Sequence, residues 1–292
     1  MDESLEIRFW GVRGSLPSPG PDTVLVGGNT ACVEIVGKGS RIVLDAGTGL
    51  RALGDELVAR GQHGHTTLLL SHVHWDHLLG LPFYAPLYMP GCEVDVLAGP
   101  IGVPLREVLE RQMSAPVFPV ELDAVGAKLR AVDLDPRRRF DVGAFEVRMT
   151  RLAHPDPTFA YRIQLGDRSV VYATDVEHGD EGPDPELVAL ARGADLLIYD
   201  AQYLPEEYAG LAGPSKRGWG HSTYEAGAAV ARAAGVRTLA LFHHDPRRDD
   251  DAVADIVRRA RRGFASTVAA REGLSLRYEL CDASRPFEQM AV

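Results

Sequence analysis

The chain has 292 residues, 45% of them hydrophobic and 25% charged, a globular composition that excludes intrinsic disorder and fibrous repeats. No apolar run approaches the ~18 to 20 residues of a membrane span, and the acidic start Met1-Asp2-Glu3 differs from a secretory signal, so we expect a cytoplasmic protein without membrane association. The formal net charge of −10 repels polyanions, so binding a nucleic-acid polymer would need a local basic patch and is not expected.

Strand-like and helical segments alternate along the whole chain. Segments rich in β-branched residues predict strands over 7–10, 31–36, 41–44, 66–70, 93–97, 127–132, 145–150, 159–165, 169–173, 195–199 and 237–242. Helices are predicted over 50–60, 103–113 and 249–271. Hairpins mixed with helices favour a layered α/β fold, in which two sheets are covered by helices on the outside. The sequence has no repeat or low-complexity linker, so residues 1–292 are expected to form a single domain.

The segment from His72 to His77 carries three imidazoles and one carboxylate at the end of the apolar strand 66–70. These side chains are ligands that zinc, manganese and iron ions prefer. In an extended segment His72 and His74 project to the same side, whereas Asp76 and His77 diverge and can reach a second ion. The motif therefore predicts ligands for two neighbouring metal ions, in preference to a chance cluster of surface histidines.

An apolar and aromatic segment, Gly80 to Met89, follows this motif directly. Three interpretations stay open for it. It could line the substrate pocket and stack a base, pack against a second subunit, or fill the core of its own subunit.

Three further ligand-type residues stand at the ends of predicted strands. His154 follows strand 145–150, Asp175 follows strand 169–173, and His243 follows strand 237–242. Each alone would be interpreted as a capping or turn residue. Their shared position at strand ends, like that of the first motif, favours a metal site.

The motif His-x-His-x-Asp-His at 72–77 resembles that of the metallo-β-lactamase superfamily, and the chain is similar to its ribonuclease Z-like and cyclic-phosphodiesterase branch. The resemblance covers nearly the whole chain. It implies a single αββα sandwich of two mixed sheets with helices outside and a dinuclear site on its edge. The implied cofactors are two divalent ions, Zn²⁺ first, with Mn²⁺ or Fe²⁺ as alternatives.

The resemblance also implies a role for each ligand-type residue. One ion would be held by His72, His74 and His154, the other by Asp76, His77 and His243, with Asp175 bridging them. We choose His243 over His244 because it directly follows the apolar strand, and leave His244 as a substrate contact. Asp45, which matches the family's early aspartate, is expected to orient a ligand histidine.

Two further segments indicate a phosphodiester substrate. The stretch from Phe9 to Ser15, followed by Gly27-Gly28-Asn29-Thr30, is similar to the opening strand and glycine loop of the branch. Trp219-Gly220-His221-Ser222-Thr223 resembles its Gly-His-Ser helix start, whose histidine contacts phosphate and protonates the leaving group. Asp200 falls where the branch places an acid paired with that histidine, although the usual residue there is glutamate. The resemblance thus predicts substrate contacts by His221, His244, Asn29 and Ser222.

These observations predict a dinuclear metal phosphodiesterase for small nucleotide-type phosphodiesters, cyclic ones in particular, with Asp76, His221 and Asp200 as catalytic residues. Two cations would lower the pKa of a bridging water, so that hydroxide attacks phosphorus, and His221 would protonate the departing alkoxide. The expected partners are the small substrate and a second copy of the chain in a homodimer. The alternatives are a lactonase or thioesterase, a tRNA 3′-end endonuclease and a non-catalytic metal-stabilised module.

Overall fold

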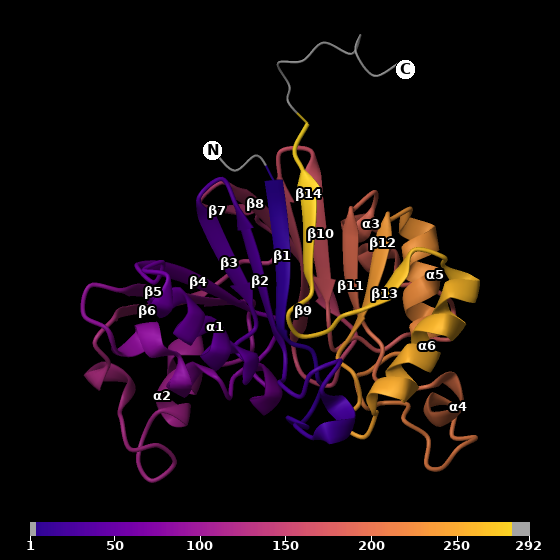
Figure 1. The fold of residues 1–292 in the computed structure, drawn as a ribbon, viewed down its shortest axis with the longest axis horizontal. Helices are drawn as coiled ribbons and strands as arrows, with labels where there is room; N and C mark the ends of the chain where they lie inside the picture. Colours follow the sequence, from indigo (N-terminus) through magenta and orange to yellow (C-terminus); the bar gives the residue numbers. More distant parts are fainter. Residues whose placement is uncertain (1–3, 282–292) are drawn as a thin grey trace.

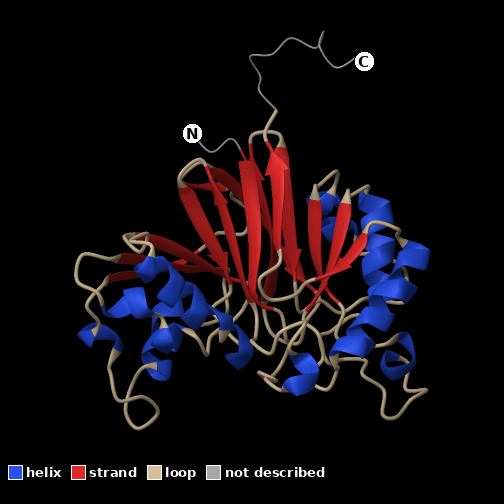
Figure 2. Cartoon of the chain, viewed as in Figure 1, coloured by secondary structure: helices blue, strands red, loops and turns tan. Residues whose placement is uncertain are grey.

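The computed structural model describes residues 4–281. Two mixed seven-stranded sheets form the centre of the molecule, and helices cover their outer sides (Figures 1 and 2). This arrangement confirms the predicted α/β sandwich. Within residues 4–281, no helix has the length and apolar character needed to cross a membrane.

The first sheet has the strand order β14-β1-β2-β3-β4-β5-β6. Its strands are β1 (Ser4–Gly11), β2 (Cys32–Gly37), β3 (Ser40–Leu44), β4 (His65–Leu70), β5 (Glu93–Ala98), β6 (Lys128–Asp133) and β14 (Ser275–Glu279). The strands from β3 to β6 pair in parallel, and the other pairs are antiparallel. Helices α1 (Gly49–Ala59) and α2 (Leu105–Gln112) lie on its outer side, to the left in Figure 1.

The second sheet has the order β13-β12-β11-β10-β9-β8-β7. Its strands are β7 (Phe140–Val142), β8 (Phe145–Leu152), β9 (Thr158–Leu165), β10 (Arg168–Ala173), β11 (Leu196–Asp200), β12 (Thr238–Phe242) and β13 (Thr267–Ala269). Its helices are α3 (Pro185–Ala191), α4 (Pro205–Tyr208), α5 (Tyr224–Ala234) and α6 (Asp250–Gly263). Of these, α5 and α6 form the outer layer on the right of Figure 1.

The main core lies between the two sheets. Along β1, Leu5, Ile7 and Phe9 are buried at alternate positions, as the two-residue period of a strand requires, and they belong to one apolar cluster with Phe145 and Val147 of β8. Burying a side chain of this size contributes about 1.5–3 kcal/mol. The packed sheets thus give a rigid base for the loops at their edges.

The C-terminal part of the chain differs from its predicted structure. The predicted helix 249–271 ends at Gly263, after which the chain becomes extended at Phe264 and forms β13 beside β12. The buried apolar stripe of α6 ends at Ala260, and Arg261 and Arg262 form part of its last turn before the chain leaves the helix. The strands β7, β13 and β14 were not predicted, because short or edge strands carry little periodic signal.

The segment 80–89 forms two short 3-10 helices, Leu81–Phe83 and Ala85–Tyr88. Leu81, Tyr84 and Leu87 are buried in the core on the outer side of the first sheet. The Tyr84 hydroxyl lies 2.7 Å from Oγ1 of Thr66. These residues therefore fill the core of their own subunit, one of the three interpretations left open, while Phe83 remains largely exposed.

Candidate metal centre

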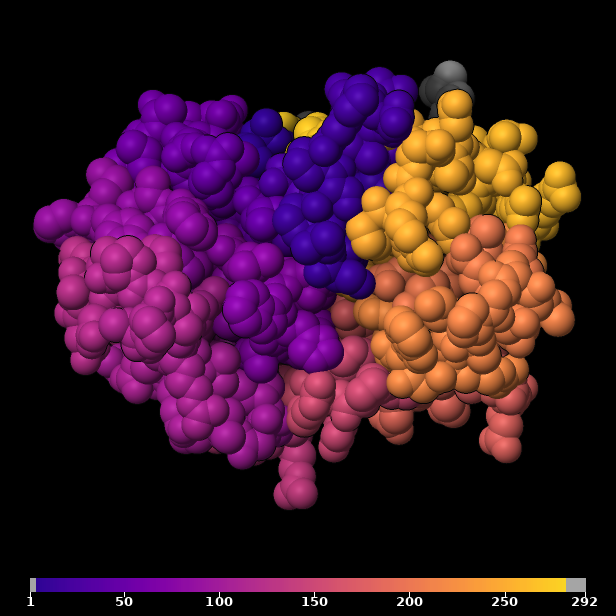
Figure 3. Space-filling view, turned by 90° about the horizontal axis from the view of Figure 1, so that it is seen from below, coloured from indigo at the N-terminus to yellow at the C-terminus, as the bar shows by residue number. Residues whose placement is uncertain are grey.

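The predicted ligand residues follow strands that end at the same edge of the sandwich. β4, β8, β10 and β12 lead into His72, His154, Asp175 and His243 respectively. Figure 3 looks onto this edge, where segments from the N-terminal part (indigo), the region around residues 50–100 (purple) and the second half of the chain (orange) meet. Residues distant in sequence are brought together there because each strand delivers its loop to the same place.

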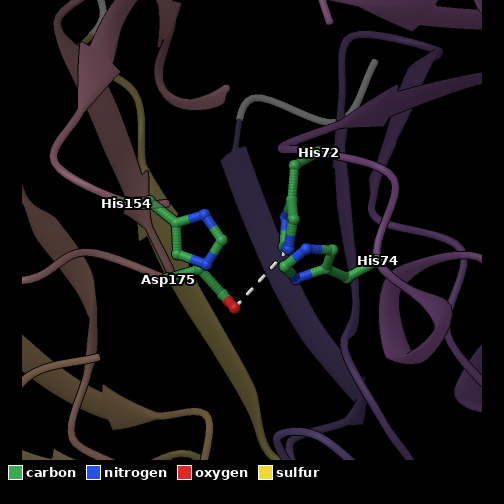
Figure 4. Close-up of side chains that lie close together, drawn as sticks. All are labelled: His72, His74, His154 and Asp175. Atoms are coloured by element: carbon green, nitrogen blue, oxygen red, sulfur yellow. Dashed lines mark ion pairs between the residues drawn. The ribbon is translucent and has the colours of Figure 1, made fainter. Parts of the chain in front are cut away.

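One group of metal-ligand atoms comes from His72, His74, His154 and Asp175. The four ligand atoms lie within 4.8 Å of one another, and Figure 4 shows the imidazoles gathered near the Asp175 carboxylate. Nε2 of His72 lies 3.6 Å from Oδ2 of Asp175. The structure therefore assembles the first predicted ligand set.

A second group comes from Asp76, His77 and His243, whose ligand atoms also lie within 4.8 Å of one another. Nε2 of His77 is 3.2 Å from Oδ2 of Asp76 and 3.2 Å from Nε2 of His243. The other oxygen of Asp175, Oδ1, lies 3.2 Å from Nε2 of both His77 and His243. Asp175 thus faces both groups, one oxygen toward each, as a bridging carboxylate would.

The protonation states of His72 and Asp175 fit a divalent metal ion. His77 differs: burial opposes its protonation, but Asp76, Asp175 and Asp45 outweigh burial and raise its pKa well above the ordinary value, so a bound ion would displace its proton. Burial and the charge of His77 lower the pKa of His72 well below its usual value, so its imidazole is neutral. Burial opposes ionisation of Asp175, but His243, His77 and His72 outweigh it and lower its pKa well below the ordinary value. Neutral imidazoles with ionised carboxylates form the donor set that zinc, manganese and iron bind. In addition, Nε2 of His72 is buried without a hydrogen-bond partner among the described residues.

Asp45 is placed to orient His77. Oδ2 of its fully buried carboxylate lies 2.7 Å from Nδ1 of His77, so Nε2 of His77 faces the second group. The same carboxylate accepts hydrogen bonds from the backbone N–H of Ser71 at 2.7 Å and from the Tyr172 hydroxyl at 2.6 Å. Sequence reasoning identified Asp45 but missed Ser71 and Tyr172, because nothing in a local pattern links them to His77.

The backbone of the centre contains several left-handed residues. Ser15, Asp45, Asp175 and His243 have φ angles of 62°, 60°, 53° and 58°. Lys38, in the turn between β2 and β3, is the other non-glycine residue of the described part with positive φ. This conformation is costly for side chains with a Cβ and tends to occur at functional sites. Ser15, another residue not predicted, donates its backbone N–H to Oδ2 of Asp76 at 2.7 Å.

His221 and Asp200 form a hydrogen-bonded pair beside the two groups. Nδ1 of His221 lies 2.9 Å from Oδ2 of Asp200, and the His221 ring lies 5.0 Å from that of His243 and 6.2 Å from that of His154. Burial opposes protonation of His221, but the charge and hydrogen bond of Asp200, with smaller contributions from other carboxylates, raise its pKa to about 9. The pairing expected from the resemblance is therefore present, with aspartate in place of glutamate.

Asp200 is itself held in place. It is fully buried and accepts backbone N–H groups from Gln202 at 3.0 Å, Ser222 at 3.3 Å and Asp175 at 3.1 Å. Its carboxylate thereby joins the loop of His221 to the backbone of the bridging residue.

Three residues predicted to contact substrate lie outside the two groups. His244 is buried with Nε2 3.0 Å from the carbonyl of Ala270, because successive residues at a strand end point to opposite sides. Ser222 is also buried, with its hydroxyl near His178 and Tyr199. Neither side chain is exposed to solvent, so the substrate contacts expected of both residues stay predictions.

Asn29 is the third of these residues. Its amide donates to Glu272 at 3.0 Å and accepts from the Thr48 hydroxyl at 3.0 Å. Both ends of the amide therefore hold the N-terminal loop in place.

Comparisons with known proteins agree with this architecture. The family described as "Beta-lactamase superfamily domain" matches residues 40–244. The chain therefore belongs to the metallo-β-lactamase superfamily, and the prediction of a metal-dependent hydrolase is confirmed at this level.

Individual relatives extend over nearly the whole chain. The ribonuclease Z of Methanosarcina acetivorans is 26% identical over 93% of this chain and 97% of its own length. Among solved structures, the metallo-β-lactamase fold protein YhfI from Bacillus subtilis covers 95% of this chain and 100% of its own, with a TM-score of 0.74 and 17% identity. A diphosphatase from the PhnP family covers 96% of this chain and 100% of its own, with a TM-score of 0.67 and 17% identity. These structures show the fold.

Proposed function

We propose that this chain is a dinuclear metal-dependent phosphodiesterase that hydrolyses small nucleotide-type phosphodiesters, cyclic ones in particular. The ions would be held by His72, His74 and His154 on one side and by Asp76, His77 and His243 on the other, with Asp175 between them. Divalent ions at such a site activate water and neutralise charge on the phosphate. Zn²⁺ is the first choice, with Mn²⁺ or Fe²⁺ as alternatives.

The observation that carries this proposal is the His221–Asp200 pair beside the ligand groups. A nucleoside alkoxide is a poor leaving group and must be protonated as its bond to phosphorus breaks. His221 directs Nδ1 to Asp200, which leaves Nε2 to donate that proton. Three backbone N–H groups hold the Asp200 carboxylate, so the imidazole is fixed in orientation.

Asp76 is proposed as a third catalytic residue as well as a ligand. Its Oδ2 accepts the backbone N–H of Ser15 at 2.7 Å and lies 3.1 Å from Nε2 of His243. The carboxylate is therefore held at the centre, where it would accept a hydrogen bond from the attacking water and orient it toward phosphorus.

A substrate panel tests the proposal. Metal-reconstituted protein would be assayed with 2′,3′- and 3′,5′-cyclic nucleotides, bis(p-nitrophenyl) phosphate, a lactone and a thioester. We expect hydrolysis of the phosphodiesters, loss of that activity in His221→Ala on the cyclic nucleotides, and full activity in the surface control His65→Ala. Turnover of the lactone or thioester above every phosphodiester would establish the carboxyl-type hydrolase instead.

A tRNA 3′-end endonuclease is the second candidate. It is favoured by the similarity to ribonuclease Z over 93% of this chain and 97% of the relative. The net charge of −10 opposes binding of a large polyanion. Incubation with a precursor tRNA carrying a 3′ trailer distinguishes the two candidate functions. Cleavage at the trailer with no turnover of cyclic nucleotides would contradict the phosphodiesterase and support the endonuclease.

We also propose that two copies of this chain form a homodimer. An apolar cavity of about 400 Å³ beside the metal motif is lined by Trp75, Phe83 and Val117, all largely exposed. Exposed apolar side chains gathered in one place are typical of protein interfaces. Light scattering during size exclusion would measure the mass, and a monomer at micromolar concentration would contradict the dimer.

A further inference from the structure

A tryptophan stands exposed beside the candidate centre. Trp219 lies between α4 and α5, two residues before His221, and 55% of it is accessible to solvent. Its neighbours Gly218 and Gly220 have φ angles of 81° and 83°, a conformation that favours glycine. The chain therefore turns on both sides of Trp219 and leaves its side chain at the surface.

Glu177 fixes the backbone on both sides of this tryptophan. One oxygen of its carboxylate accepts the N–H of Gly218 at 2.6 Å, and the other accepts the N–H of Gly220 at 2.9 Å. The Tyr208 hydroxyl donates to the same carboxylate at 2.9 Å. Because Glu177 lies two residues after Asp175, the loop of Trp219 is tied to the loop that carries the bridging carboxylate.

The same loop lies directly against a predicted metal ligand. A Cβ atom on Gly220 would lie 2.2 Å from Cδ2 of His154, a distance that no real contact allows. Only glycine permits this approach. The backbone that follows Trp219 is therefore packed against His154, and His221 comes two residues after Trp219.

Lys216 and Tyr203 connect Trp219 to His221. The Lys216 ammonium lies 3.9 Å from the centre of the Trp219 ring and 5.8 Å from that of Tyr203, and the Tyr203 ring lies 5.7 Å from the His221 ring. Among residues 4–281, no carboxylate forms an ion pair with Lys216. Tyr203 is only 3% exposed, so it links Lys216 to His221 below the surface, and only Lys216 and Trp219 of this row reach solvent.

We propose that Trp219 and Lys216, here called the Trp219 platform, bind the base of a nucleoside leaving group. The inference rests on the proposed function, because it places the base on the side of the centre where His221 protonates the departing oxygen. Lys216 lies against the indole ring, 55% of Trp219 remains accessible to a base, and the positive charge of Lys216 attracts nucleotide anions.

The platform defines a class of substrate. Base stacking on an aromatic side chain is tolerant of sequence, because every base has a π-face. Glu177 holds the backbone on both sides of Trp219, so less conformational freedom is lost on binding and the contact contributes to affinity. The expected substrates are phosphodiesters whose leaving alcohol carries a flat base, with little preference among bases.

Binding of adenosine to metal-free protein tests the platform apart from catalysis, since adenosine has no phosphate. Ligand-observed NMR would give its dissociation constant for the parent protein, Trp219→Ala, Trp219→Phe and Leu211→Ala. Leu211, 83% exposed on the same connecting segment, is the matched control. We expect Trp219→Ala to raise the constant by about tenfold or more, Trp219→Phe to raise it less, and Leu211→Ala to leave it unchanged. No saturable binding by the parent, or equal constants for the parent and Trp219→Ala, would overturn the platform.

A second measurement connects the platform to turnover. KM for a 3′,5′-cyclic nucleotide should rise more in Trp219→Ala than KM for the abasic cyclic phosphate of the same ring, because only the nucleotide has a base to stack. Equal increases in KM for the two substrates would overturn the proposal that the base stacks on Trp219. If the parent hydrolyses neither substrate, the proposed function is wrong. The adenosine measurement then still shows whether the Trp219 platform binds a base.

Discussion

The carboxylate of Asp45 lies 2.7 Å from Nδ1 of His77, and neither side chain is exposed to solvent. The contact sets which nitrogen of the imidazole carries the proton and which one faces Asp76 and His243. A residue with no ligand atom at the centre thereby controls the geometry of a ligand.

Asp45→Asn should weaken metal binding without removing any ligand. Loss of the carboxylate charge makes His77 a poorer donor and frees its tautomer, so metal affinity should fall by about 10- to 100-fold. Competition with a chelator of known affinity measures the change. Tyr172→Phe removes one hydrogen bond to the same carboxylate and should have a smaller effect. Unchanged affinity in a folded Asp45→Asn protein would contradict the orienting role.

Asp175→Ala should reduce the metal content from two ions per chain and abolish hydrolysis, because Asp175 faces both ligand groups. Elemental analysis after reconstitution gives the content. Asp175→Asn is a second variant that controls for a folding defect, because asparagine tolerates the left-handed backbone better than alanine. Asp141→Ala, at an exposed acid on β7, serves as control. One ion or none in the parent protein would contradict the dinuclear centre.

The loss of activity in His221→Ala should increase with the basicity of the leaving group. A nitrophenolate leaves without a proton, whereas a ribose alkoxide needs one, so kcat/KM should fall by about 100-fold or more on a cyclic nucleotide and much less on a nitrophenyl phosphodiester. Asp200→Asn should show the same selectivity more weakly. Both variants are compared at matched metal occupancy. Equal losses on the two substrates would assign His221 to phosphate binding or to structure.

Phosphomonoesters should be turned over more slowly than phosphodiesters. A dianionic monoester brings excess negative charge to a centre that already contains Asp76 and Asp175, and it competes with the attacking water for the ions. Initial rates with p-nitrophenyl phosphate and bis(p-nitrophenyl) phosphate measure the preference. Faster turnover of the monoester would assign the chain to the phosphatases.

Chelation should abolish turnover reversibly and lower the melting temperature by several degrees. A ligand that binds only the folded state stabilises it by about 2.7 kcal/mol at a free concentration 100 times its Kd. Calorimetry with and without chelator, followed by addition of metal, measures both effects. Restored stability without restored turnover of any panel substrate would favour the non-catalytic metal-stabilised module.

The clustering of the candidate ligands was predictable because they follow the ends of strands, and the strand order brings those ends to one edge. The hydrogen bond from Ser15 to Asp76 was not predictable, because it joins residues 61 positions apart through an irregular loop. The orientations of His244 and Ser222 depend on the path of the chain after a strand or turn, which composition does not encode. The strand β14 escaped prediction because it is stabilised by pairing with β1 at the other end of the sequence.

The left-handed backbone at Asp45, Asp175 and His243 bears on how such a sequence changes over time. Glycine would suit each of these backbone positions better, but it would also remove a buried acceptor: at Asp45, the Ser71 N–H and the Tyr172 hydroxyl would lose their partner. Relief of backbone strain and loss of buried hydrogen bonds therefore act in opposite directions on the stability of any variant that gives up one of these side chains.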